Sequence, residues 1–311
     1  MSRRVVKFAG DARHLGAHVR HVTARLVTRL AAALPVLVAL SADPVFAQNN
    51  DQFLAPTGGQ RQQKAAAPTP RGADGKVIIG TVPGQKGHWI RTRRELIVDS
   101  EMTSKPLPSD IKLEDVPFQP WARALWDYRR TRDDRDSPHA RCKPSAGPRQ
   151  IGTAYGFELV DLPALKQVMI FDIGGPQTFR TIHMDRTEHP KNLQPSYYGH
   201  SIGRWEGDTL VVDSVGFNEK HWIDALGLVH TDQYHQIERF TRLDSNTLKY
   251  EVTVDDPGAY TKPWTAGFHL RWNDGAELFE YVCQQNNLNP VMVIGDDELP
   301  ISRADPIGIT P

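Results

Sequence analysis

Apolar and polar residues alternate in short runs through the second half of the chain. The clearest run is TLKYEVTV at 247–254, in which every second residue is apolar and the residues between are polar. Eight or nine such runs follow Pro148, and turn-forming stretches such as EGD at 206–208 and NDG at 273–275 separate them. Because alternate residues of a strand point to opposite faces, the pattern predicts a mainly β domain built as an antiparallel meander.

A series of strands of this length can close into a barrel or fold into two packed sheets. A closed antiparallel barrel of about eight strands leaves room for one small ligand, as in lipocalins. We therefore expect the meander to close into a lipocalin-like barrel, with a β-sandwich as the alternative.

One amphipathic helix is predicted before the strands, over about residues 120–131. In PFQPWARALWDYRR, Trp121, Leu125 and Tyr128 recur at helical spacing, and Pro120 occupies a first-turn position where proline is tolerated. The basic residues that follow alternate with acidic ones, so we interpret them as a solvent-exposed face.

The first 47 residues have the pattern of an export signal. Seven basic residues precede an apolar run of 11 residues from Leu30 to Leu40, and Val45 and Ala47 follow at the positions of a cleavage site. This run is shorter than the about 20 residues that a membrane-spanning helix needs. We therefore expect removal of residues 1–47, a periplasmic or secreted mature protein, and no membrane span in the mature chain.

The composition changes again after the signal. Residues 48–87 are rich in Gln, Ala, Pro and Gly and show no apolar periodicity, which predicts a disordered linker. Residues 88–300 are predicted to form a single β-rich domain. Without the signal, 30 basic and 35 acidic residues remain. This mildly acidic balance argues against a nucleic-acid partner, because proteins that bind nucleic acid rely on clustered basic residues.

Three motifs resemble those of an uncharacterised family of exported bacterial proteins: GRWEGDTLVV at 203–212, DDPGAYTKPW at 255–264 and EYVC at 280–283. The resemblance covers about residues 117–290 and implies one coherent domain with paired cysteines. The chain has two cysteines, Cys142 and Cys283, and an even count also favours pairing in an oxidising compartment. We therefore expect a disulfide between them.

Our first functional hypothesis is that the barrel holds a small apolar or aromatic molecule in a cavity. The connection from Gly216 to His235 is long for a hairpin and mixes aromatic with titratable residues, as a lid over a barrel mouth would. The predicted ligand-binding residues are four aromatic side chains, Trp205, Trp222, Tyr260 and Trp264. For Tyr260 and Trp264 the structural alternative is an aromatic plug in the core.

The second hypothesis is a cofactor-free enzyme of the lyase, hydratase or isomerase type, in which histidines and carboxylates move protons. Its candidate acids and bases are His183, His200, Glu206, Asp224, His230, His235 and Glu238. An apolar neighbour such as Trp205 would raise the pKa of Glu206. The structural alternatives are a β-turn at Glu206 and a cross-strand ion pair at Glu238.

The sequence carries no signature of a metal site or a nucleotide cofactor, so we predict neither. His183, Asp185 and His200 could approach one another, but their spacing is too generic to indicate metal ligands. A third hypothesis, an envelope interaction module, predicts an exposed apolar patch and no cavity.

Overall fold

The computed structural model describes residues 66–92, 96–98, 111–132, 136–153, 155–173 and 179–283. The predicted export signal, residues 1–47, lies outside the described residues, as do residues 48–65 of the predicted linker. No helix among the described residues is both long and apolar enough to cross a membrane.

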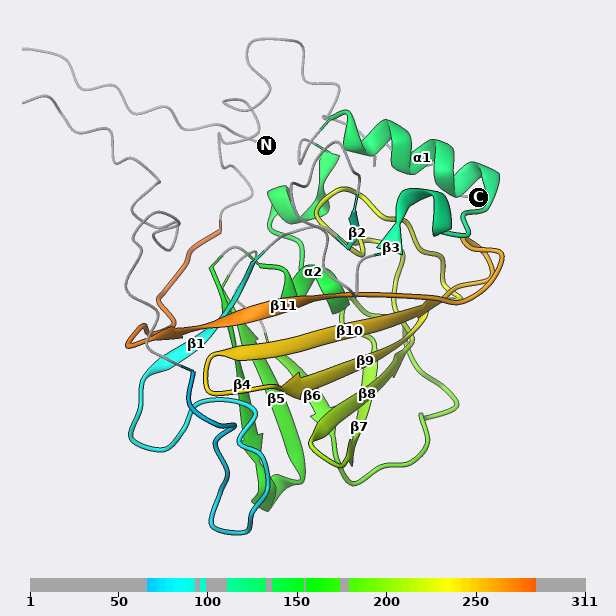
Figure 1. The fold of residues 1–311 in the computed structure, drawn as a ribbon. Helices are drawn as coiled ribbons and strands as arrows, with labels where there is room; N and C mark the ends of the chain where they lie inside the picture. Colours follow the sequence, from blue (N-terminus) through cyan, green and yellow to red (C-terminus); the bar gives the residue numbers. More distant parts are fainter. Residues whose placement is uncertain are drawn as a thin grey trace, which may run out of the picture. The chain divides into compact units, whose positions relative to one another are not determined.

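Nine of the described strands form a closed barrel (Figure 1). Around the barrel, the order is β1 (Gly87–Arg91), β11 (Trp264–Asp274), β10 (Thr247–Asp255), β9 (His235–Arg242), β8 (Thr209–Val215), β7 (His200–Glu206), β6 (Phe179–His183), β5 (Gln167–Asp172) and β4 (Phe157–Leu162). Neighbouring strands are antiparallel except β6 and β7, which are parallel, and β1 pairs with β4 to close the ring. The predicted lipocalin-like barrel is therefore confirmed, and the β-sandwich alternative is wrong.

Side chains alternate between the barrel interior and the outer face along the long strands. In β10, Leu248, Tyr250, Val252 and Val254 are buried and the residues between them are partly exposed, as the sequence pattern predicts. From β11, Phe268 packs into the same core, with its ring centroid 5.1 Å from that of Tyr250. Burial of such side chains stabilises the fold by roughly 1.5–3 kcal/mol each.

Short helices and a two-stranded sheet accompany the barrel. They are α1 (Pro120–Arg130), α2 (Gly147–Ile151), the parallel strands β2 (Ile97–Val98) and β3 (Ile111–Lys112), and 3₁₀ helices at Leu113–Asp115, Pro138–Arg141 and Pro163–Leu165. The helix predicted over 120–131 is confirmed as α1. Its buried face carries Leu125 and Trp126, whereas Tyr128, which the periodicity places on the apolar face, is exposed.

Residues 66–86 pack against the barrel, so the linker predicted over 48–87 is wrong for this part. Trp89 Nε1 donates a hydrogen bond to the carbonyl oxygen of Ile79 at 2.9 Å, and the Arg242 guanidinium donates to that of Gly80 at 2.8 Å. These bonds use main-chain carbonyls, which is why the side-chain composition of the segment gives no sign of them. We call residues 72–83 the strap.

A disulfide joins Cys142 to Cys283, with the two Cα atoms 5.6 Å apart. It confirms the predicted pairing and ties the segment before α2 to residues that follow β11. The alternation in ELFEYVC at 277–283 also suggests a last strand, but these residues form none. The reason is that β11 already pairs with β1 on one side and β10 on the other, so the closed ring offers no free edge there.

Candidate functional site

An open pocket with a volume of about 870 Å³ lies at one end of the barrel. Strand β6 ends at His183 and pairs with β7 only as far as Ile202, so Gly203–Trp205 pair only with β8. The pocket lies beside this unpaired edge. Its walls come from the strap, the β4–β5 hairpin, residues Met184–Thr187 and the end of β7.

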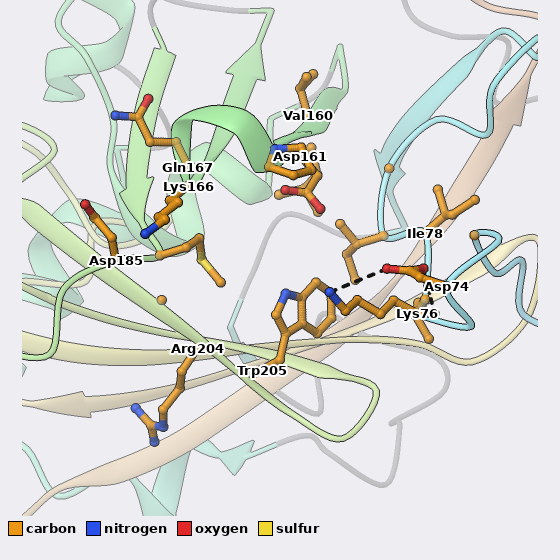
Figure 2. A pocket seen from close by; sticks show the side chains of 18 of the residues that line it. Asp74, Lys76, Ile78, Val160, Asp161, Lys166, Gln167, Asp185, Arg204 and Trp205 are labelled. Carbon is orange, nitrogen blue, oxygen red and sulfur yellow. Dashed lines mark hydrogen bonds and ion pairs between the residues drawn. The ribbon is translucent and has the colours of Figure 1, made fainter.

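Apolar side chains from four segments line the pocket. Trp205 is on the inward face of β7, and its indole points toward the centre of the pocket (Figure 2). Leu159 from β4, Ile79 from the strap and Met184 after β6 extend this apolar surface. Gly203 is required beside them, because a Cβ at that position would lie 2.5 Å from the sulfur of Met184.

Charged side chains surround the apolar surface. In Figure 2, Asp74 and Lys76 of the strap lie on one side of Trp205, and Lys166 and Asp185 lie on the other. The Asp74 carboxylate and the Lys76 ammonium form an ion pair at 3.4 Å. An apolar wall with a few polar groups that fix orientation is the usual construction of a small-molecule site.

Comparison with protein-family models, curated proteins and solved structures found no match. Function is therefore inferred from the geometry of the pocket and the chemistry of the residues around it. The resemblance of the three sequence motifs to exported bacterial proteins stays a prediction.

A buried polar network occupies the barrel interior. Arg180 from β6 and Glu238 from β9 form an ion pair, and both side chains are almost completely buried. The Glu238 carboxylate also accepts hydrogen bonds from Gln236 Nε2 and the Tyr250 hydroxyl, each at 3.0 Å, and Arg180 Nε donates to Ser201 Oγ at 3.1 Å. These side chains fill space that a ligand inside the barrel would need, so the open end is the candidate site.

Four histidines, His183, His189, His200 and His235, gather with Asp213 on the outer face of the barrel; we call this group the histidine cluster. The rings of His183 and His200 stack with centroids 5.1 Å apart, and His189 Nδ1 lies 2.8 Å from His200 Nδ1. Asp213 Oδ1 lies 3.1 Å from His189 Nε2 and 2.9 Å from His235 Nε2. Within the described ranges, no three His, Cys, Asp or Glu side chains are placed to hold a metal ion.

The surroundings give the members of the histidine cluster different charge states. Burial, reinforced by the neighbouring imidazoles and Arg186, lowers the pKa of His200 to about 4. The hydrogen bond between His235 and Asp213 raises the pKa of the imidazole and lowers that of the carboxyl. At neutral pH, His200 is therefore neutral and Asp213 is ionised.

The seven predicted acids and bases lie at four separate places: His183, His200 and His235 in the histidine cluster, Glu238 in the barrel interior, Asp224 and His230 between β8 and β9, and Glu206 at the β7–β8 turn. None of the seven lines the pocket. They do not converge on one substrate position, as acid–base catalysis requires.

Asp224 and His230 hold the connection between β8 and β9 in place. The Asp224 carboxylate accepts hydrogen bonds from the main-chain N–H groups of Leu226 at 3.0 Å and Leu228 at 3.1 Å. The His230 Nε2 atom lies 3.0 Å from the carbonyl oxygen of His221. Both side chains are buried. The connection predicted as a lid is therefore a packed part of the core, in which Asp224 and His230 bond to main-chain groups of the connection itself.

Glu206 is exposed at the turn and bonded to arginines. Its carboxylate lies 2.9 Å from Arg239 and 2.7 Å from Arg204, and hydrogen bonds from these two side chains lower its pKa. The predicted increase in its pKa is wrong, because consecutive residues of a strand point to opposite faces and Glu206 points outward where Trp205 points inward. The turn itself is confirmed by Gly207, which has a φ of 60°.

Of the four predicted ligand-binding residues, only Trp205 lines the pocket. Trp222 is buried against Arg129, whose guanidinium carbon lies 4.9 Å from the ring centroid. Tyr260 donates a hydrogen bond to a main-chain carbonyl at 2.9 Å, and its ring centroid lies 5.3 Å from that of Trp264. Trp222, Tyr260 and Trp264 are therefore core residues. For Tyr260 and Trp264, this is the aromatic plug given above as the structural alternative.

Several residues of the pocket and the histidine cluster have no distinctive sequence signal. Lys76 and Ile79 lie in a region of linker-like composition, and Asp213 is an ordinary polar position in β8. His189 stands in HMDRTEHP, a short run rich in titratable residues, and this run is the signal that could have identified it.

Proposed function

We propose that this protein is an exported β-barrel that binds a small apolar or aromatic molecule in the pocket at the open end of the barrel. The observation that carries the proposal is the pocket itself, since its volume of about 870 Å³ is typical of small-molecule sites, which span about 300–1,000 Å³. The Trp205 indole offers a flat apolar face, and Leu159 and Met184 extend it. A ring system can stack there while its polar groups meet the charged side chains at the edge.

Export is supported by the signal pattern and by the Cys142–Cys283 disulfide, because disulfides persist in oxidising compartments. We therefore place the mature protein in the periplasm or the medium. Cell fractionation followed by N-terminal sequencing tests this placement, and the exported chain should begin at Gln48.

A fluorescence titration with 1-anilinonaphthalene-8-sulfonate tests the pocket with an aromatic probe of suitable size. Trp205→Ala removes the indole and should weaken dye binding about 10- to 100-fold, which corresponds to the roughly 1.5–3 kcal/mol of one buried apolar side chain. The matched control is Tyr128→Ala, which removes an exposed aromatic side chain on α1 outside the pocket and should bind as the wild type does. Equal affinities of wild type and Trp205→Ala contradict the proposed site.

Native mass spectrometry of protein purified from its own periplasm tests for a natural ligand. One bound molecule per chain is expected in the wild type, and it should be lost in Trp205→Ala. The two other hypotheses are not retained. The candidate acids and bases of an enzyme lie apart, and an envelope module predicts no cavity.

A further inference from the structure

The segment that follows β6 forms one wall of the pocket and is attached to the outer face of the barrel. Residues Met184–Thr187 line the pocket, and His189, two residues later, belongs to the histidine cluster. The pocket and the cluster are therefore two sides of the same short stretch of chain, which we call the wall segment (residues 184–190).

The wall segment is anchored by the main chain at one end and by side chains further along. The Met184 amide donates to a carbonyl of the barrel at 2.9 Å, and the next such bond comes only later, from the Ser196 amide at 3.0 Å. Between these two anchors, Arg186 and His189 bind side chains of the barrel. These two side chains therefore help to hold the wall segment against the barrel.

Hydrogen bonds run through the cluster in one consistent direction. A guanidinium can only donate, so Arg186 Nη1 donates to His200 Nε2 at 3.0 Å. The ring proton of His200 is then on Nδ1 and donates to His189 Nδ1 at 2.8 Å. His189 in turn carries its proton on Nε2 and donates to Asp213 Oδ1 at 3.1 Å. Both imidazoles are neutral in this arrangement, and all four ring nitrogens are in use.

An added proton breaks this chain of hydrogen bonds. On His200 Nε2 it would oppose the Arg186 donor, so two donors would face each other. The new charge would also lie close to the Arg186 guanidinium. Protonation therefore loosens the contacts through which the wall segment is held.

Titratable and charged groups surround the His189–His200 pair on the neighbouring elements. His183 on β6 and Arg186 after it act on His200, and Asp213 on β8 bonds His189. One step further out, Asp185 acts on His183, and Asp255 on β10 acts on His235 of β9. Asp213 and Asp255 favour a proton on His235, whereas burial and the cationic and imidazole neighbours oppose one on His200. At His200 the opposing effects are larger, since its pKa is lowered to about 4. A released His200, with an ordinary pKa of about 6.5, takes up a proton far more readily.

We propose that protonation of His200 releases the wall segment, so that acid widens the pocket. This inference rests on the proposed function only for its biological meaning, because the release itself involves no ligand. The direction of this pH dependence follows from the His200 pKa. Since the folded value lies below the ordinary value of 6.5, the attachment is fully stable above about pH 6.5 and is weakened as the pH falls toward 4.

Hydrogen–deuterium exchange of the peptide that contains the wall segment tests the proposal on the full exported chain. After correction for the intrinsic pH dependence of exchange, its protection should fall about tenfold between pH 7.5 and pH 5.5, because pH 5.5 is one unit below the ordinary histidine pKa. Peptides from β10 should keep their protection.

The double variant His189→Gln, His200→Gln replaces both imidazoles while each glutamine still offers a donor and an acceptor, so its protection should be equal at the two pH values. His200→Gln alone serves if the double variant does not fold, and it must show a smaller fall than the wild type. The matched control His269→Gln changes an outward-facing histidine on β11, outside the cluster, and should keep the full fall.

Equal protection of the wild type at the two pH values overturns the inference. So does a histidine variant whose protection falls as far as that of the wild type. Neither result depends on ligand binding. The proposed function would be contradicted by a different result, namely dye binding at pH 7.5 that does not depend on Trp205. The two proposals can therefore fail separately.

Discussion

Replacing Glu238 with alanine tests whether the barrel interior is filled and dry. The Glu238 carboxylate is completely buried and accepts hydrogen bonds from Arg180, Gln236 and Tyr250. The substitution removes the negative charge but leaves the Arg180 guanidinium inside the barrel, where, among the described residues, its remaining bond is to Ser201 Oγ at 3.1 Å. A buried charge without its partner is among the most destabilising single changes in a protein.

The expected loss is about 3–5 kcal/mol, the usual cost of removing one partner of a buried ion pair. Against a total stability of about 5–15 kcal/mol for a domain, this is a third or more of the free energy of unfolding. Urea denaturation, monitored by tryptophan fluorescence, measures this loss. The matched control is Glu206→Ala, which also removes a carboxylate bound by two arginines but at an exposed position, and it should leave the unfolding midpoint close to that of the wild type.

If Glu238→Ala were no more destabilising than Glu206→Ala, water would have to reach Arg180, and the argument that the ligand binds at the barrel mouth rather than inside would fail. The double variant Arg180→Met, Glu238→Leu gives a further check. It should recover much of the loss, because an apolar pair of similar volume can replace a buried ion pair at little net cost.

Three further predictions follow from the packing. Replacing Cys142 and Cys283 with serine should lower the free energy of unfolding by up to about 5 kcal/mol in the chain-entropy model, given their separation of 141 residues, and thiol titration of the denatured, unreduced wild type should find no free thiol. Burial raises the pKa of Asp172 from 3.8 to about 7, so ionisation favours unfolding and the wild type should lose up to about 4 kcal/mol as the pH rises from 4 to 8. Asp172→Asn should lack this slope in urea denaturation, and an unchanged slope would show that another group causes it. Gly80→Ala places a Cβ 1.8 Å from the carbonyl oxygen of Leu159, so it should displace the strap and weaken dye binding; an unchanged dye affinity would mean that the strap does not shape the pocket.

Local patterns in the chain were sufficient for much of the fold. The alternation in TLKYEVTV became β10 with the expected face buried, and the helical spacing around Leu125 became α1. Both depend on interactions between residues close in sequence. The strap was missed because it is held through main-chain carbonyls, such as that of Ile79, which accept hydrogen bonds irrespective of the side chains they belong to.

The candidate site was only partly predictable. Trp205 was predicted together with Trp222 and Tyr260 as an aromatic side chain, and residue type could not separate the one that lines the pocket from those in the core. The sequence alone does not distinguish an aromatic residue that lines a pocket from one that is buried in the core. What distinguishes the three is where β6 ends and which segments pack beside that end.

By itself, the sequence determined where most of the strands after Pro148, the helix and the cysteines occur, because these follow from residue types at fixed local spacing. The tertiary structure alone decided which face of β9 points inward: in HQIERFTR, Ile237 lies outward and Glu238 lies inside. Glu238 can be buried only because Arg180 reaches it across the barrel, and the pairing of strands far apart in sequence brings the two together. The histidine cluster has the same origin, since its members come from β6, β7, β8, β9 and the wall segment, and only the register of the closed sheet makes them neighbours.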